Sequence, residues 1–240
     1  MNHSDSQDLL ISTIADAIRA HAAIPELDID VDLERAYALQ HRVTKLVSPT
    51  ITGGIKVGVT QPQAQSFLGV DHALLGSLYA DARLDSGAQV PFIQGRALEL
   101  EFAVLVDREG RPQAVAPAIE VVYVNFERKT DMTPANLVIA NLGADLIVVG
   151  DFLPWESLGG DVAAVLIREG EVVNEASMSE ALGGPAAGLP WVCTEAQRRG
   201  YALSDRTLIM MGACGAVIPA EKGQYSANYG PMGSLEFTVA

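Results

Sequence analysis

Two acidic residues, Glu99 and Glu101, stand two positions apart in GRALELEFAVLV, residues 95 to 106. The segment alternates apolar residues in a way that is typical of a strand. Because successive side chains of a strand point to opposite faces, the two carboxylates share one face, about 6 to 7 Å apart. A cation between them would relieve their repulsion. The alternative is an exposed strand face on which both acids are solvated.

A third acid, Glu120, interrupts the apolar run APAIEVVYV. The neighbouring residues indicate a buried strand, where an isolated carboxylate is costly unless it is neutral, paired or bound to a metal ion. Three carboxylates without a cysteine or histidine pattern would form an oxygen site, which suits Mg²⁺, Mn²⁺ or Ca²⁺ better than Zn²⁺. Pairing of Glu120 with an arginine or lysine is the alternative that the sequence leaves open.

Two more residues have the chemistry of a reactive site. Lys56 lies in the glycine-flanked apolar segment GGIKVGVTQP. Burial would lower its pKa and suit it to proton transfer, whereas a lysine that reaches from the strand to solvent is the alternative. Asp71, in FLGVDHALLGSLYAD, could orient a water molecule or Lys56, although aspartate is also common in turns. No metal-ligand spacing connects the four histidines, which are His3, His21, His41 and His72.

The elements that must position these side chains change along the chain. Apolar residues recur at helical spacing over residues 5–22 and 33–47, which predicts two amphipathic helices. From Gly53 onward, short segments rich in β-branched residues alternate with Gly, Pro and Asp, which predicts strands. Two later helices are expected, over residues 133–141 and 186–199.

This order favours an α+β fold, since the helices come first and most strands follow. We expect an N-terminal helical cap over residues 1–50 and a β-rich catalytic domain over residues 51–240. The two parts are expected to form one compact unit. The Glu169-Gly170 pair between two strand-like segments predicts a hairpin turn.

Charge and composition exclude several kinds of partner. Lys plus Arg total 16 against 30 Asp plus Glu, and the net charge of -14 repels nucleic-acid phosphates and anionic membranes. A small anionic substrate would therefore need a local positive centre, such as a metal ion or a lysine. We find no apolar run of about 18 residues and no basic secretory region, so we expect a cytoplasmic protein. Cys193 and Cys214 form no CxxC motif, which is typical of ordinary buried thiols.

Six motifs carry a family resemblance. In chain order they are IKVGVTQPQAQSFLGVD, RALELEFAVLV, VAPAIEVVY, ANLGADLIVVGDF, ALGGPAAGLPWV and LIMMGACG. In this order the sequence resembles the 2-keto-4-pentenoate hydratase and 4-oxalocrotonate decarboxylase branch of the fumarylacetoacetate hydrolase superfamily, over about residues 31 to 240. The resemblance implies a mixed β-roll with N-terminal and peripheral helices and a homo-oligomer. It also implies a bound Mg²⁺ or Mn²⁺ ion and a 2-oxoacid or 2-hydroxydienoate substrate.

The resemblance also implies roles for individual residues. The metal ligands would be Glu99, Glu101 and Glu120, and the catalytic residues would be Lys56 and Asp71. Three positions depart from the family pattern, where an acid, an aspartate and a threonine are replaced by Leu74, Ala140 and Met211 respectively. These departures make the expected substrate pocket more apolar and leave the exact reaction open.

The implied reaction is metal-dependent hydration of a 2-hydroxy-2,4-dienoate to a 4-hydroxy-2-oxoacid. Lys56 would move protons, and Asp71 would orient water or the lysine. The same enolate chemistry serves decarboxylation of a 2-oxo-3-enedioate, hydrolysis of a 3-acylpyruvate or tautomerisation. A non-catalytic member that assembles with an active pathway enzyme is an alternative of a different class. A third is a β-rich domain with solvated acids, which would bind no divalent ion.

Overall fold

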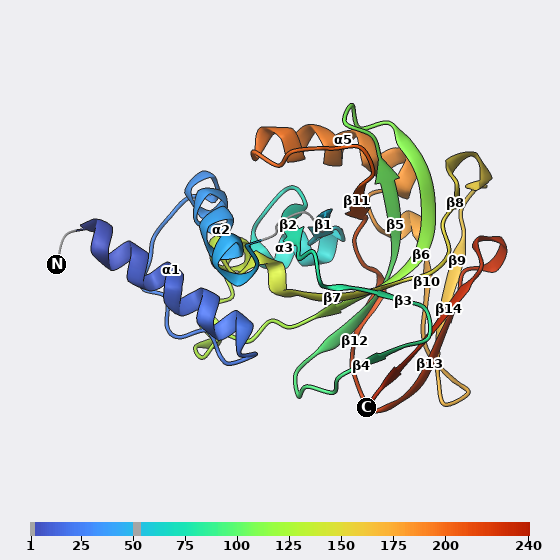
Figure 1. Cartoon of the computed structure of the whole chain (residues 1–240), viewed down its shortest axis with the longest axis horizontal. Helices are drawn as coiled ribbons and strands as arrows, with labels where there is room; N and C mark the ends of the chain where they lie inside the picture. Colours follow the sequence, from blue (N-terminus) through green and yellow to red (C-terminus); the bar gives the residue numbers. More distant parts are fainter. Residues whose placement is uncertain (1–2, 50–53) are drawn as a thin grey trace.

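The computed structural model describes residues 3–49 and 54–240, with helices at one end of the molecule and sheets at the other (Figure 1). Helices α1 (His3–Arg19) and α2 (Leu33–Val47) form the helical end. The Asp32 carboxylate accepts a hydrogen bond from the backbone N–H of Arg35 and so caps the first turn of α2. Both helices lie where the sequence predicts them. The boundary expected between residues 50 and 51, and Gly53, lie outside the described residues.

Two sheets form the rest of the molecule. The larger one contains nine strands, in the order β2 (Leu74–Leu78), β1 (Gly54–Gly58), β11 (Thr207–Met210), β5 (Ala97–Val106), β6 (Pro112–Val122), β7 (Ala144–Val149) and β3 (Arg83–Asp85), with β12 (Cys214–Pro219) beside β5 and β8 (Leu153–Pro154) beside β6. The smaller one contains five strands, in the order β10 (Glu171–Ser177), β9 (Ala163–Arg168), β13 (Gly223–Asn228), β14 (Ser234–Val239) and β4 (Ala88–Val90). These counts refer to the residues that the structure describes.

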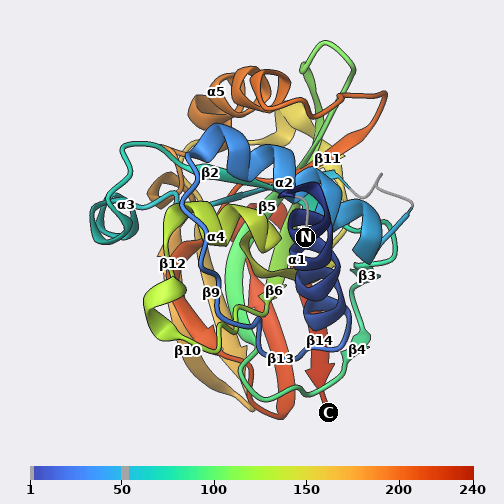
Figure 2. The same cartoon turned by 90° about the vertical axis from the view of Figure 1, so that its left-hand side faces the viewer.

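Strands β5 and β6 form the longest antiparallel pair, from Ala97 opposite Val122 to Val106 opposite Pro112. Both strands are buried along most of their length, which agrees with their near-continuous apolar sequences. One hydrophobic core joins the two sheets to the helices; it includes Ile14 of α1, Leu39 of α2, Phe102 of β5 and Phe237 of β14. Helices α1, α2 and α4 (Pro134–Ile139) lie in front of the sheets when the molecule is viewed from its helical end (Figure 2).

The two later helices and the hairpin turn lie where the sequence predicts them. Helix α4 begins at Pro134, and the Thr133 hydroxyl accepts a hydrogen bond from the Asn136 N–H. Helix α5 (Pro185–Arg198) follows the glycine-rich turn and lies above the sheets in Figure 1. Glu169 and Gly170 both have positive φ angles, 50° and 85°, as a tight hairpin turn between β9 and β10 requires.

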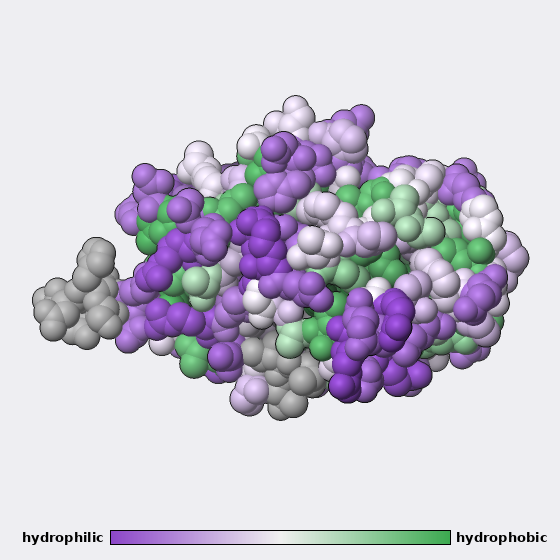
Figure 3. Space-filling view, turned by 90° about the horizontal axis from the view of Figure 1, so that it is seen from above, coloured by the Kyte–Doolittle hydropathy of each residue, from purple (hydrophilic) through white to green (hydrophobic). Residues whose placement is uncertain are grey.

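The surface is mixed in hydropathy. Seen from above, apolar residues occur in small groups among hydrophilic ones (Figure 3). The short helix α3 (Pro62–Leu68) buries none of its residues, and Phe67 on it is 83% exposed.

Both cysteines are free and buried, as expected. No described helix has the length and apolar character that crossing a membrane requires.

Candidate metal centre

The antiparallel pairing of β5 and β6 brings the three predicted acids together. Glu99 lies directly opposite Glu120, and Glu101 lies opposite Ala118. Each glutamate offers one carboxylate oxygen, and these three oxygens lie within 4.8 Å of one another. The alternation of side chains along β5 therefore puts both of its acids on the face that Glu120 shares.

Burial makes this cluster different from an ordinary acidic surface. Glu101 and Glu120 are both fully buried, whereas Glu99 remains partly accessible to solvent. Within the described residues, Oε1 of Glu101 and Oε2 of Glu120 accept no hydrogen bond. Buried carboxylate oxygens without partners are costly, and hard oxygen donors at this spacing fit a divalent cation. The alternative of solvated acids on an exposed face is wrong for Glu101, and Glu99 is only partly exposed.

The pKa values of the clustered carboxyl groups also favour a bound cation. Burial raises the pKa of Glu99 to about 7, and the Glu120 carboxylate adds to this effect. Burial and the charges of Glu120 and Glu99 raise the pKa of Glu101 well above its ordinary value. A bound cation would oppose both shifts, because it stabilises the ionised carboxylates.

Lys56 of β1 completes the cluster. It is 2% exposed, and its Nζ lies 2.6 Å from Oε1 of Glu120 and donates a hydrogen bond of 3.0 Å to the Leu142 carbonyl. Burial lowers the pKa of Lys56, but the charges of Glu120 and Glu99 outweigh burial, and the pKa is raised. The expectation that burial lowers this pKa is therefore wrong, because the acids stabilise the ammonium. The alternative of a lysine reaching solvent is also wrong, whereas pairing of Glu120 with a lysine is confirmed.

A strained turn that the sequence analysis did not single out holds the lysine. Asn141, Leu142 and Gly143 have successive positive φ angles of 54°, 52° and 66°. Asn141 stabilises this turn because its Oδ1 accepts a hydrogen bond from the Ser77 N–H and its Nδ2 donates one to the Ser77 carbonyl. The turn directs the Leu142 carbonyl at Lys56. An Asn-Leu-Gly sequence after a helix is a weak signal for such a turn, because Asn and Gly tolerate positive φ.

Gly212 fixes one oxygen of the cluster. Its backbone N–H donates a hydrogen bond of 2.9 Å to Oε2 of Glu101, which leaves Oε1 free of a described partner. Gly212 has a φ of 100°, and a Cβ at this position would clash with the Thr60 side chain. The sequence analysis considered the neighbouring Met211 and missed this N–H.

The structure does not bring Asp71 to the cluster. Its side chain is 97% exposed, and its Oδ1 lies 2.6 Å from Nδ1 of His72. Hydrogen bonding to His72 lowers the pKa of Asp71. Among the described residues, Asp71 has no recorded contact with Lys56 or the glutamates, so its catalytic role stays a prediction. The three departures from the family pattern are all buried, at Leu74, Ala140 and Met211.

Comparisons with known proteins show which enzymes the chain is similar to. No protein-family model matches the chain. A 2-keto-4-pentenoate hydratase from Burkholderia vietnamiensis is 28% identical over 230 residues, which cover 86% of this chain and 86% of the relative. A 4-oxalocrotonate decarboxylase from a Pseudomonas species is 24% identical over 201 residues, which cover 78% of each chain. The chain is thus similar to this hydratase and decarboxylase branch at low identity, as the six motifs indicate.

A solved structure matches this chain over the whole fold. The 4-oxalocrotonate decarboxylase from Pseudomonas putida G7, complexed with magnesium and adipate, matches with a TM-score of 0.89 at 20% sequence identity. The match covers 100% of this chain and 99% of that chain. The α+β fold of the fumarylacetoacetate hydrolase type, expected from the six motifs, is thus confirmed.

Proposed function

We propose that this chain is a divalent-metal-dependent lyase of 2-hydroxy-2,4-dienoates or related 2-oxoacids, and that it is a hydratase giving a 4-hydroxy-2-oxoacid. One observation carries the proposal. Two fully buried carboxylates and a third partly buried one converge beside Lys56, with two carboxylate oxygens that have no described hydrogen-bond partner. The hydratase and decarboxylase relatives support the same reaction class.

Glu99, Glu101 and Glu120 would hold Mg²⁺ or Mn²⁺. When bound, such an ion supplies a positive centre that attracts the 2-oxoacid end of a substrate and stabilises the negative charge of an enolate. The chain has a net charge of -14, so an anionic substrate needs a local centre of this kind. Glu99 is the ligand nearest to solvent, and we infer that substrate approaches from its side.

Lys56 is the proton-carrying group at this centre. Glu120 and the Leu142 carbonyl fix the direction of its ammonium, and an ammonium has three protons, so one remains for the substrate. We assign to Lys56 the proton transfer to C5 as the dienol loses its O–H proton and becomes the 2-oxo-3-enoate. The hydroxyl of a water molecule then adds to C4 while C3 takes a proton, so that the net change is the addition of one water.

Decarboxylation of a 2-oxo-3-enedioate is the second candidate, and a specific observation favours it. Leu74, Ala140 and Met211 are buried apolar side chains at positions where the family pattern has polar ones. Water addition needs polar groups that orient the water, whereas loss of carbon dioxide to an enolate does not.

The test is turnover of both substrate types. Purified protein would be incubated with 2-hydroxy-2,4-pentadienoate or 2-oxo-3-hexenedioate in Mn²⁺ or Mg²⁺, and products would be identified by NMR. We expect a 4-hydroxy-2-oxoacid from the first substrate and no reaction after chelation. Carbon dioxide release from the second substrate alone would support the decarboxylase. Metal binding without turnover of either would favour the non-catalytic assembly partner.

We also infer from the family resemblance that the protein is a cytoplasmic homo-oligomer that associates with a pathway enzyme. Light scattering of the purified chain tests the first part, and a mass that corresponds to a single chain would contradict it. Copurification from cell extract tests the association.

A further inference from the structure

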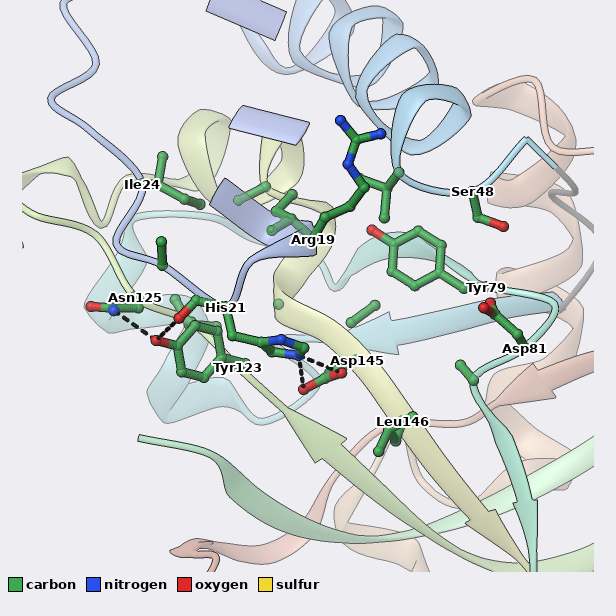
Figure 4. Close-up of a pocket in the computed structure, with 18 residues that line it drawn as sticks. Arg19, His21, Ile24, Ser48, Tyr79, Asp81, Tyr123, Asn125, Asp145 and Leu146 are labelled. Atoms are coloured by element: carbon green, nitrogen blue, oxygen red, sulfur yellow. Dashed lines mark hydrogen bonds and ion pairs between the residues drawn. The ribbon is translucent and has the colours of Figure 1, made fainter. Parts of the chain in front are cut away.

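A cavity lies apart from the carboxylate cluster, where the end of α1 meets the turn that holds Lys56. Its volume is about 220 Å³. The residues that line it include Arg19, His21, Tyr79, Ala140, Gly143 and Asp145, but neither Lys56 nor any of the three glutamates. Figure 4 shows the ring of Tyr79 directed toward Arg19 and the ring of His21 directed toward Asp145. The proposed metal site does not use this cavity.

The Tyr79 hydroxyl marks the cavity as a binding site. Tyr79 is 7% exposed, and its hydroxyl makes no hydrogen bond within residues 3–49 and 54–240. The side chain of Asn141 lies near this hydroxyl, but the hydrogen bonds that it makes are with the backbone of Ser77. A buried hydroxyl without a partner costs free energy, and a ligand atom in the cavity would supply the missing partner.

The lining determines the chemistry of the ligand. Asp145 is already paired with Arg96 and His21, and Arg19 is engaged with the Leu46 carbonyl and Asp16. Asp81 is the remaining charged residue of the lining and most of the others are apolar, so an anionic ligand would be desolvated without a free positive partner. An engineered apolar cavity of about 150 Å³ binds benzene, so the present volume suits one ring with a substituent.

We propose that this cavity binds an uncharged single-ring compound whose oxygen accepts a hydrogen bond from the Tyr79 hydroxyl. Phenol is a suitable probe because it combines one ring with one such oxygen. Benzene is the matched probe without the oxygen, and benzoate is the matched probe with a charge.

The same cavity wall connects to the metal centre. Ala140, Gly143 and Ala144 line the cavity, and between them the Leu142 carbonyl accepts the hydrogen bond of Lys56. A ligand packed on this wall stabilises the turn and therefore the contact of Lys56 with Glu120. A cation on the other oxygen of Glu120 would be repelled by the Lys56 ammonium held beside it, so this step rests on the proposed metal site. Phenol should weaken Mn²⁺ binding, and by thermodynamic reciprocity Mn²⁺ should weaken phenol binding by the same factor.

The hydroxyl-specific test is calorimetric titration of phenol and benzene into wild type and Tyr79→Phe. We expect about tenfold weaker phenol binding in Tyr79→Phe, as loss of one hydrogen bond implies, and equal benzene binding in both. Without ligand, Tyr79→Phe should melt no lower than wild type, because the hydroxyl has no partner to lose. Tyr225→Phe is the matched control, since that hydroxyl donates to the Glu221 carbonyl outside the cavity. Equal phenol affinity in wild type and Tyr79→Phe, or benzoate binding that matches phenol, would overturn the site.

Two further variants separate this site from the metal centre. In the presence of a chelator, Glu101→Gln should bind phenol as chelated wild type does. Ala22→Leu should block the cavity from its exposed edge and abolish phenol binding. Mn²⁺ affinity, measured by electron paramagnetic resonance, should fall several-fold when phenol is added to wild type and stay constant in Ala22→Leu. An unchanged Mn²⁺ affinity in phenol-saturated wild type would refute the coupling through Lys56.

Discussion

Lowering the pH from 8 to 6 should weaken divalent-metal binding by this chain about tenfold. Metal binding requires ionised carboxylates, so a proton on Glu99 competes directly with the cation. With a pKa of about 7 in the metal-free protein, Glu99 is mostly ionised at the higher pH and mostly protonated at the lower one. The ratio of the two ionised fractions is about ten, from the ordinary titration relation. Glu101, whose pKa is also raised, makes the dependence steeper.

The same shifts predict an opposite effect on the stability of metal-free protein. A carboxyl group whose pKa is raised on folding stabilises the folded state when protonated, and this contribution is lost as pH rises from the unfolded pKa through the folded one. For Glu99 that window runs from 4.5 to about 7. The shift corresponds to at most about 3.5 kcal/mol at about 1.4 kcal/mol per pKa unit, and to less because Glu99 is partly exposed.

Isothermal titration with Mn²⁺ and thermal melts across this pH range check both effects. Chelated wild type should melt at a lower temperature as the pH rises from about 5 to about 8, whereas Mn²⁺ should stabilise it increasingly over the same range. Glu99→Gln should flatten the pH dependence of the chelated melt. A metal affinity that is constant between pH 6 and pH 8 would refute the reasoning, because it would mean that no carboxyl group of the cluster carries a proton at pH 6.

Three other changes test single contacts of the site. Glu101→Gln should abolish most of the Mn²⁺-induced rise in melting temperature. The control Glu127→Gln, at an exposed acid, should leave that rise unchanged. Equal rises in the two variants would remove Glu101 from the ligand set. Lys56→Ala should retain Mn²⁺ binding but lose turnover by at least about a hundredfold, as the loss of a general acid implies, and wild-type rates would exclude its catalytic role. Gly212→Ala should destabilise the fold by about 1–3 kcal/mol in a denaturant melt, because the φ of 100° is strained for alanine and the nearby Thr60 leaves no room for a Cβ. An unchanged midpoint of unfolding would contradict the clash with Thr60.

The sequence was sufficient to predict the strand that carries Glu99 and Glu101. Period-2 alternation is a local property, and it places both side chains on one face whatever the rest of the chain does. The pairing of Glu99 with Glu120 is different, because it depends on the register between β5 and β6. The motif resemblance indicated that the three acids act together, but only the register brings them into one cluster.

Features that depend on distant parts of the chain were not predictable in this way. The pKa of Lys56 depends on acids from two other strands, and local burial alone gives the wrong direction. The positive φ angles of Asn141 and Leu142 are stabilised by Ser77, which lies far away in the sequence. Strand β13 carries mixed polar and small residues, so its pattern is weak, whereas the alternation of Leu235, Phe237 and Val239 in β14 is a signal that the sequence analysis missed.

The charge balance of the centre explains why a divalent cation suits it better than a monovalent one. Three ionised carboxylates and one ammonium leave a net charge of -2, and two of the carboxylates have no access to solvent. A monovalent ion would leave a buried negative charge, which low-dielectric surroundings make costly. Protonation is the other way to remove that charge, and the raised pKa values of Glu99 and Glu101 reflect it. Protons and a divalent cation therefore compete for the same carboxylates, so occupancy by metal should depend on both pH and metal concentration.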